Sequence, residues 1–345
     1  MSARRWLSSA VTAAILVGLG ACGGGGGSGD SPPAAVVIDI TAANRDSVAH
    51  ASAASVLSSS PTAAIPLSSA NAGPGSALSG RLATLLRQPL LAQAPAVSGR
   101  EQLLAVVGPV IQPCAFSGTV SLTIDDRDNS GAASVGDVMT IVFNQCHDTA
   151  AEFVNGTTTA TYTQIGSVPV PTIGARLTMS QFTTVTTNHT LTLNGAMLLN
   201  YSQPSASVEI TRLTADGAVT IAFSTHLPYA DTVTLQSGYM QEDTYDASVA
   251  PPPGSTVAGR TTTTLQGRLQ STQAGGLLDV ATPPAAPLVT YSADAYPSSG
   301  AVQVTGRSST LLMTALSVTG VRLDLDADGN GSFESTATVS WDWLL

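Results

Sequence analysis

The chain of 345 residues contains no lysine, so all 13 of its basic residues are arginine. Against them stand 23 acidic residues, which give a formal net charge of -10. Without lysine, Schiff-base chemistry and a phosphate-binding loop ending in Gly-Lys are both excluded. An acidic, lysine-free surface also argues against nucleic acid as a partner and against electrostatic docking on anionic lipid.

Aromatic residues are scarce as well, at 5% of the chain, and only three cysteines are present. A core with few large rings buries little apolar area per residue, so we expect other interactions to contribute to stability. Catalytic signatures are also missing. There is no Gly-x-Ser-x-Gly elbow, and the four histidines are scattered rather than placed at metal-ligand spacing. The sequence therefore favours a non-enzymatic protein over an enzyme.

Residues 1–21 have the features of a secretory signal peptide. Arg4 and Arg5 precede an apolar stretch, Trp6 to Leu19, that is too short to remain as a spanning helix. The segment from Leu19 through Gly20 and Ala21 to Cys22 resembles the lipobox of bacterial lipoproteins, in which the signal is cut before a lipidated cysteine. The resemblance implies that Cys22 carries a diacylglycerol and an amide-linked acyl chain such as palmitate, which together anchor a protein stably to a membrane.

The residue after the cysteine is Gly23 rather than Asp, which in such lipoproteins favours the outer membrane. Residues 22–35 are rich in glycine and cannot bury enough surface to fold, so we expect a tether. The periplasmic and the surface side of the membrane remain equally open.

Residues 36–110 form a helical, low-complexity segment that we expect to pack on the β domain C-terminal to it. Arg81 to Leu91 carries an apolar helical stripe, and Ser98 with Glu101 forms a capping box for a further short helix.

Residues 111–345 change to alternating runs rich in Thr, Ser and Val, separated by turn residues, which predicts an antiparallel β domain. The fold class is therefore mainly β, an antiparallel meander preceded by a short helical segment, and the meander is an open sheet, a sandwich or a soluble barrel. Asn194-Gly195 and Asp216-Gly217 are turn dipeptides typical of hairpins, and Glu242-Asp243 is interpreted as a charged loop tip. Beyond the first hairpin, the expected strands are Thr157 to Gln164, Ala175 to Thr186, Thr190 to Asn200, Ser207 to Leu213, Ala218 to Thr225, Thr232 to Gly238, Gly259 to Gln270, Val302 to Thr305, Ser317 to Leu325 and Ser335 to Trp341.

The first hairpin joins two alternating runs, Ser117 to Ile124 and Val138 to Asn144, which lie between Cys114 and Cys146. Antiparallel pairing of these runs would bring the two cysteines side by side. Disulfides persist in exported proteins. We therefore predict a bridge between Cys114 and Cys146 at the open end of this hairpin, with two free buried thiols as the alternative.

Near the C-terminus, the segment Asp326 to Glu334 resembles the first nine positions of an EF-hand calcium loop. Oxygen side chains alternate along it and a glycine is sixth, as Ca²⁺ binding in a tight turn requires. The twelfth position is Ala337 instead of Glu, and the flanks are strand-like, so this is a calcium loop at the end of a β-hairpin. The predicted ligands are Asp326, Asp328, Asn330, Ser332 and Glu334, with Asp324 as a further carboxylate.

The tip of the first hairpin follows the same pattern over a full twelve residues. Its predicted calcium ligands are Asp126, Asp128, Ser130, Ser134 and Asp137. For both segments the alternative is an Asp/Asn/Gly turn without an ion.

The lipobox, polyglycine tether, cysteine-bracketed hairpin and C-terminal acidic hairpin together resemble uncharacterised β-rich lipoproteins of Gram-negative bacteria, a group to which no activity is attached. The leading hypothesis is a non-enzymatic, lipid-anchored envelope protein with a disulfide-stapled, calcium-braced β domain for structural or binding work. The alternatives are a carrier of a lipid or other apolar ligand within a curved sheet, and a hydrolase of envelope polymers with two carboxylates converging in a cleft.

Overall fold

The computed structural model describes residues 35–57, 82–83, 85–87, 109–114, 116–147, 150, 152–166, 172–225 and 229–345. All of them belong to one unit, Ala35–Leu345. The predicted signal peptide, Cys22, the tether up to residue 34 and the capping-box helix lie outside the described residues. Within the described part, no helix has the length and apolar character needed to cross a membrane.

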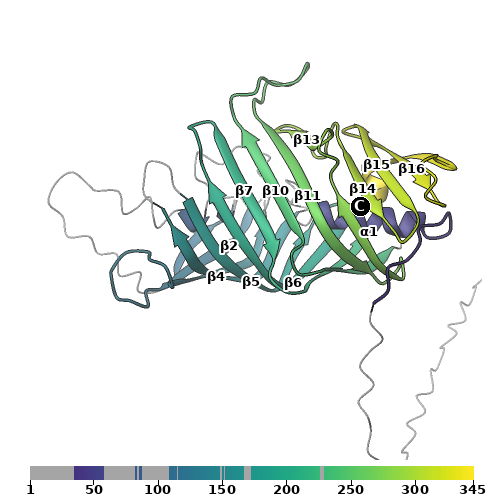
Figure 1. Cartoon of the computed structure of the whole chain (residues 1–345). Helices are drawn as coiled ribbons and strands as arrows, with labels where there is room; N and C mark the ends of the chain where they lie inside the picture. Colours follow the sequence, from purple (N-terminus) through teal and green to yellow (C-terminus); the bar gives the residue numbers. More distant parts are fainter. Residues whose placement is uncertain are drawn as a thin grey trace, which may run out of the picture. The chain divides into compact units, whose positions relative to one another are not determined.

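The strands form one sheet in which every paired strand is antiparallel to its neighbours, so the predicted mainly β, antiparallel fold is confirmed (Figure 1). The strands are β1 (Val110–Pro113), β2 (Ser117–Asp125), β3 (Val138–His147), β4 (Phe153–Ile165), β5 (Thr172–Val185), β6 (His189–Ser202), β7 (Val208–Ala215), β8 (Val219–Thr225), β9 (Ala230–Leu235), β10 (Met240–Asp246), β11 (Arg260–Ser271), β12 (Gly276–Ala281), β13 (Leu288–Tyr291), β14 (Ala301–Thr305), β15 (Thr310–Ser317), β16 (Gly320–Asp326) and β17 (Ser335–Ser340). In the described part of the chain, the helices with defined ends are α1 (Arg45–Leu57) and α3 (Trp341–Leu344).

In several places, two short strands lie end to end and pair with one long neighbouring strand. The C-terminal half of β6 pairs with β7 and its N-terminal half pairs with β8, so β7 and β8 follow each other along β6. In the same way β9 and β10 both lie along β11, and so do β12 and β13. Each such pair of short strands therefore acts as one long strand with a break near its middle.

In β2 to β6 the strands are continuous, but they bend at the same level of the sheet. The bulge residues Gln145 and Gln181 have φ of 47° and 49°, and their amides donate to the side chains of Asn155 and Asn194 at 3.2 and 2.7 Å. Each asparagine precedes a glycine with positive φ, 116° at Gly156 and 131° at the second. Bulges and glycine bends of this kind curve a sheet. We call this line the crease; it runs through Gly118, Gln145, Gly156, Gln181 and Gly195.

Two predicted hairpin turns are therefore wrong. Asn194-Gly195 lies inside β6 at the crease, and Asp216-Gly217 separates the two collinear strands β7 and β8, where the Asp216 amide donates to the Ala196 carbonyl at 2.9 Å. The physical reason is that a positive φ serves a mid-strand bend as well as a two-residue turn.

The predicted strands correspond to β4, β5, β6, β7, β8, β9, β11, β14, β16 and β17, with bounds that differ by a few residues. Strands β1, β10, β12, β13 and β15 were not predicted. The interpretation of Glu242-Asp243 as a loop tip is also wrong, because both residues lie in β10. Glu242 faces outward to Arg212, whereas Asp243 is buried.

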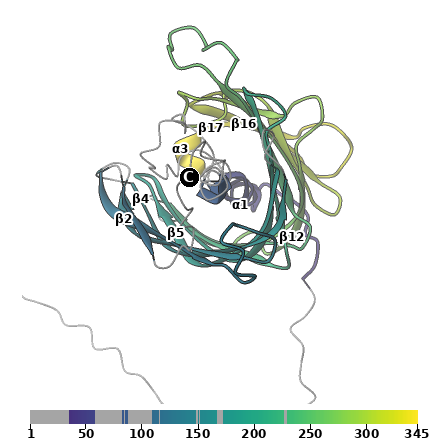
Figure 2. The same cartoon turned by 90° about the vertical axis from the view of Figure 1, so that its left-hand side faces the viewer.

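The curved sheet encloses α1 (Figure 2). Every residue from Val48 to Val56 is buried, and Ala and Ser predominate among them. A helix that is buried on all sides must satisfy its own polar groups. The Ser52 hydroxyl donates to the Val48 carbonyl at 2.8 Å, and the Ser55 hydroxyl donates to the Ser52 carbonyl at 2.7 Å. The small side chains let the wall of the sheet approach closely.

Tyrosine hydroxyls from the sheet and its connecting loops donate hydrogen bonds to backbone carbonyls of α1 and of the helical residues 82–83 and 85–87. Tyr229 donates to the Ser47 carbonyl at 3.4 Å and Tyr239 to the Ser55 carbonyl at 3.3 Å. Residues 82–83 and 85–87 are helical, and the Leu86 carbonyl accepts a hydrogen bond of 2.9 Å from Tyr162. The inward side chains of the sheet, of α1 and of Leu82, Leu85 and Leu86 form one hydrophobic core.

The segment before α1 is fixed to the sheet. Val37 forms a parallel bridge with Leu277 of β12, and the Ile38 carbonyl accepts a 2.9 Å hydrogen bond from the Arg307 amide. The Ile40 amide then donates to the Ser309 hydroxyl at 2.6 Å. These contacts guide the chain from the outside of the sheet to its interior.

The predicted first hairpin and its disulfide are confirmed. β2 and β3 pair antiparallel, with Val120 opposite Phe143, and Cys114 is bonded to Cys146 with the two Cα atoms 5.5 Å apart. The bridge lies at the open end of the hairpin, so the acidic tip from Asp126 to Asp137 is at the other end.

Candidate metal centres

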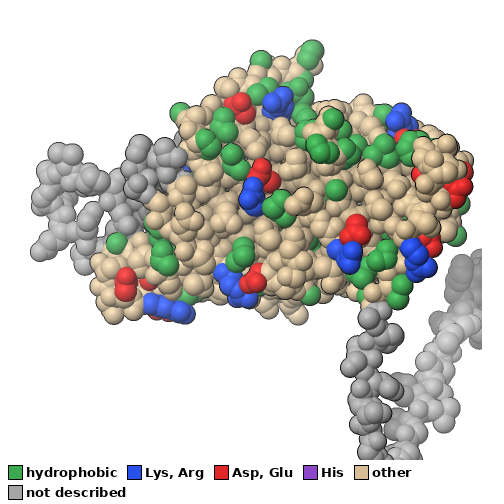
Figure 3. Space-filling model, in the orientation of Figure 1, with side chains coloured by type: hydrophobic (Ala, Val, Ile, Leu, Met, Phe, Trp, Pro, Cys, Tyr) green, Lys and Arg blue, Asp and Glu red, His purple; other side chains and the backbone are tan. Residues whose placement is uncertain are grey.

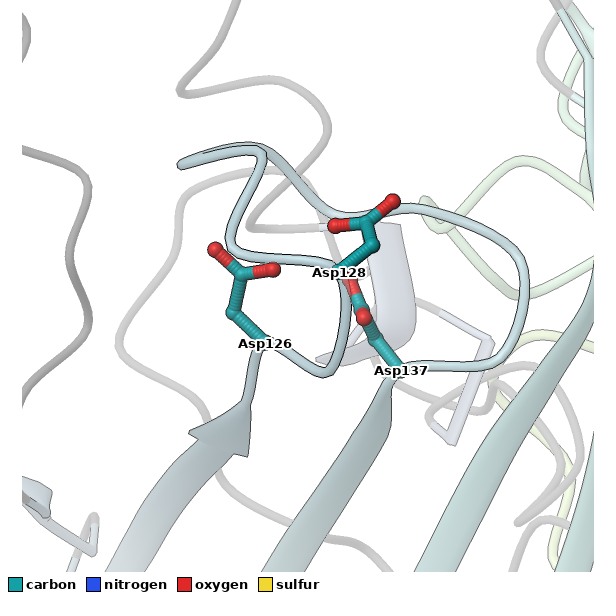
Figure 4. Close-up of side chains that lie close together, drawn as sticks. All are labelled: Asp126, Asp128 and Asp137. Carbon is teal, nitrogen blue, oxygen red and sulfur yellow. The ribbon is translucent and has the colours of Figure 1, made fainter.

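The first acidic loop connects β2 to β3 and brings three carboxylates together (Figure 4). Asp126, Asp128 and Asp137 each present an oxygen within 4.8 Å of the others. Asp137 is 1% exposed at the base of the loop, and the other two lie nearer the solvent. Strand pairing of Asp125 with Val138 closes the loop at this point.

Backbone amides of the loop hold these carboxylates. Asp126 accepts from Ser130 and Gly131 at 3.1 and 2.8 Å. Asp137 accepts from the amides of Arg127 and Ser134 at 3.0 and 2.7 Å. These bonds offset the cost of burying the Asp137 charge.

The two predicted serine ligands of this loop are placed differently. The Ser134 hydroxyl lies between two carboxylates, 2.8 Å from Asp128 and 3.2 Å from Asp137, whereas the Ser130 hydroxyl donates to the Ala132 carbonyl. Hydrogen bonds from Ser130, through its amide, and then from the Ser134 hydroxyl lower the pKa of Asp128 to about 2. Asp128 is therefore ionised at neutral pH and available to a cation.

The second acidic loop connects β16 to β17 and repeats this arrangement. Asp326, Asp328 and Glu334 each present an oxygen within 4.8 Å of the others. Asp326 is 5% exposed and accepts from the amides of Gly329 and Gly331 at 2.7 and 2.9 Å. The amide after the first aspartate donates to the last acid in both loops, from Ala327 to Glu334 here at 2.7 Å. Glu334 thus takes the position that Asp137 has in the first loop.

The remaining predicted ligands of the second loop are not all directed into it. Asn330 donates to Asp328 at 3.0 Å and accepts from the Ser332 amide at 2.7 Å. Asp324 lies outside the three-carboxylate cluster, because its oxygens accept from Arg322 at 2.6 Å and from Thr336 at 2.8 Å.

The geometry of both loops fits a calcium ion. Calcium–oxygen distances are about 2.3 to 2.6 Å, so two ligands on opposite sides of one ion are roughly 5 Å apart. Three carboxylates whose oxygens lie within 4.8 Å of one another can therefore share one Ca²⁺. With one oxygen from each side chain, each cluster supplies three of the six to eight oxygens that calcium takes, and second carboxylate oxygens, backbone carbonyls or water would complete the set.

The two acidic loops are separate clusters. One joins strands near the β1 edge and the other joins the last two strands, and in Figure 1 they appear at opposite sides of the sheet. Among the described residues, these are the two groups of three or more acidic, histidine or cysteine side chains close enough to hold an ion.

In comparisons with known proteins, no family model, no curated protein and no solved structure matches this chain.

Proposed function

We propose that this protein is a non-enzymatic lipoprotein of the bacterial envelope, anchored to the outer membrane through Cys22, with a calcium-braced β domain that does structural or binding work. The anchor is supported by the segment from Leu19 to Cys22. The export that it implies agrees with the disulfide between Cys114 and Cys146.

The observation that carries the calcium part is the repeated arrangement of the two loops. Two unrelated stretches of sequence, 200 residues apart in their first aspartates, place three carboxylates around one point with the same donors from the backbone. Like charges this close repel one another unless a cation lies between them. Each ion would join the ends of two neighbouring strands.

A role for the outer face of the sheet is supported by what fills the inside. The interior is occupied by α1 and by Leu82, Leu85 and Leu86 of the chain itself. On the outer face, charges are neutralised locally: Arg176 pairs with Asp216, Arg212 with Glu242 and Arg268 with Asp279. In Figure 3, several acidic (red) and basic (blue) side chains lie next to each other on a largely uncharged face.

Equilibrium dialysis of the whole chain against radioactive calcium tests the metal sites. We expect two ions per chain, one for each cluster, with dissociation constants of about 0.1 to 1 mM, as in other extracellular modules. Asp126→Asn and Asp326→Asn should each remove one ion. Asp279→Asn, which changes an acid of the outer face, is the matched control and should keep both. Absence of binding at about 10 mM calcium would contradict the metal part of the proposal.

Metabolic labelling with an alkyne-tagged palmitate tests the anchor. The wild-type chain should take up the label and sediment with outer membranes, and Cys22→Ser should do neither. Cys114→Ser is the matched control, because it also removes one thiol and should leave labelling unchanged. Equal labelling of the wild type and Cys22→Ser would contradict the anchor.

A further inference from the structure

The segment that precedes α1 lies against the second acidic loop. Asp39 accepts hydrogen bonds from the amide and the hydroxyl of Ser308 at 3.0 and 2.9 Å. Ser308 in turn lies close to the loop, because a Cβ at Gly329 would be 2.7 Å from the Ser308 carbonyl oxygen. In Figure 1 the purple segment before α1 lies beside the yellow C-terminal strands. The second acidic loop is therefore near the start of the described unit, Ala35.

Covalent geometry limits how far Ala35 can be from the proposed anchor. Cys22 and Ala35 are thirteen residues apart, so the chain between them spans at most about 45 Å. A glycine-rich chain of this length has a mean reach of about 20 Å. A unit of the size of Ala35–Leu345 has an expected radius of gyration of about 20 Å as well. The side of the unit that carries Ala35 should therefore be the side nearest to a membrane that holds Cys22.

Apolar side chains are exposed at this side. Phe333 of the second acidic loop is 49% exposed, and Val36, next to Ala35, is 60% exposed. Burying such side chains among lipid headgroups removes apolar area from water, and interfacial segments bury theirs by about 5 to 10 Å. The anchor already holds the unit near the membrane, so even a weak contact of this kind forms at a high effective concentration.

The charges at this side determine which headgroup the loop can meet. Asp328 and Glu334 of the second acidic loop are exposed. Arg307, a basic residue at this side, donates to the Val37 carbonyl at 2.9 Å and lies 3.9 Å from Asp39. The carboxylates of the loop attract the ammonium group of a zwitterionic lipid such as phosphatidylethanolamine, and they repel an anionic headgroup.

We propose that the second acidic loop contacts the membrane surface, with the Phe333 ring among the headgroups of a zwitterionic phospholipid. The inference rests on the proposed anchor at Cys22 and is independent of calcium. The first acidic loop would then lie on the side that faces away from the membrane.

The first acidic loop provides a matched control. It is also acidic and carries an apolar residue, Val135, that is 61% exposed. In Figure 1 the two loops lie at opposite sides of the sheet. A contact that depends on composition alone would involve both loops, whereas a contact that depends on the anchor involves only the second.

Spin labelling of the whole lipidated chain tests the contact. Cys114 and Cys146 are bonded to each other, and Cys22 is acylated in the proposed protein, so a single new cysteine carries the nitroxide. Phe333→Cys and Val135→Cys are reconstituted in vesicles of phosphatidylethanolamine and phosphatidylcholine, with chelator to exclude calcium. Collisions of the nitroxide with oxygen and with a neutral nickel chelate are then measured. Protein contacts lower both collision rates, whereas immersion in lipid raises the oxygen rate and lowers the nickel rate.

We expect the ratio of oxygen to nickel collisions to be several-fold higher at Phe333→Cys than at Val135→Cys. Flotation of the same samples in a density gradient reports on the anchor separately. If the chain floats with the vesicles but the two ratios are equal, the contact is overturned and the anchor stands. A higher ratio at Ile111→Cys, on the exposed strand β1, than at Phe333→Cys would also overturn the contact. A chain that does not float would overturn the anchor and the contact together.

Anionic lipid tests the part that charge plays. Replacing phosphatidylethanolamine with phosphatidylglycerol should lower the ratio at Phe333→Cys, because like charges repel each other. Combining this variant with Asp328→Asn and Glu334→Gln should restore the ratio. The same ratio in both lipids would overturn the assignment to a zwitterionic headgroup.

Discussion

Single residues determine where the sheet bends. Gly156 has φ of 116°, and a Cβ at this position would lie 2.5 Å from the Gln181 carbonyl oxygen. No side chain fits there without movement of the neighbouring backbone. Gly195 meets the Ala218 carbonyl oxygen at 2.8 Å in the same way. The curvature of the sheet thus depends on glycine at a few positions of the crease.

Gly156→Ala should lower the free energy of unfolding by about 2 to 6 kcal/mol, since backbone strain and overpacking each cost about 1 to 3 kcal/mol. Gly254→Ala is the matched control, because Gly254 has φ of 91° but nothing within 4 Å of an added Cβ. It should cost only about 1 to 2 kcal/mol for the backbone conformation. Urea unfolding followed by circular dichroism compares them, and equal losses would contradict the role of close packing at the crease.

His189 should make stability depend on pH. It is 5% exposed, and burial lowers its pKa to about 4. Between about pH 6.5 and 4 the unfolded chain therefore binds a proton that the folded chain does not, so the free energy of unfolding falls as the pH is lowered, by at most about 3 kcal/mol. His189→Gln should flatten this part of the profile in urea unfolding, and His147→Gln is the control. Identical profiles for His189→Gln and the wild type would contradict the prediction.

At this scale the sequence is informative where chemistry restricts the residue type. Cys114 and Cys146 could be paired from their places beside two alternating runs, and the acidic clusters could be assigned from the spacing of Asp126, Asp128 and Asp137. The burial of His50 could not be predicted, because its partner Leu344 is 294 residues away and nothing local marks the contact.

At the scale of elements, the hairpin of β2 and β3 has a disulfide at one end and an acidic cluster at the other. The disulfide closes its open end and the first acidic loop closes its tip. The strands between them could be predicted because their side chains alternate, with Val120 and Leu122 buried. The split of one long line into β7 and β8 could not, since Asp216-Gly217 has the composition of a hairpin turn.

Removal of the disulfide tests this hairpin. Cys114→Ser combined with Cys146→Ser should lower the free energy of unfolding by about 3 to 4 kcal/mol, because the bridge restricts a long loop of the unfolded chain. Reductant should lower the urea midpoint of the wild type to that of the double variant and leave the variant unchanged. A wild-type midpoint that does not respond to reductant would show that the bridge contributes nothing.

At the scale of the whole described unit, a sheet with few aromatic side chains is curved around its own helix. The alternating pattern predicts the sheet but not this curvature, which arises from the crease, nor the position of α1 inside it. The Ala- and Ser-rich sequence of α1 reads as a surface or low-complexity segment, yet Val48 to Val56 are buried. Long-range packing of this kind leaves no periodic signal in the chain.

We propose that aspartate oxygens around calcium help to stabilise this sheet. Differential scanning calorimetry of the whole chain in about 5 mM calcium and in chelator tests it most directly. At roughly ten times the dissociation constant, each ion adds about 1.4 kcal/mol, so two sites should raise the Tm by several degrees. The increase should disappear when Asp126→Asn and Asp326→Asn are combined. The same Tm for the wild type in calcium and in chelator would contradict the account.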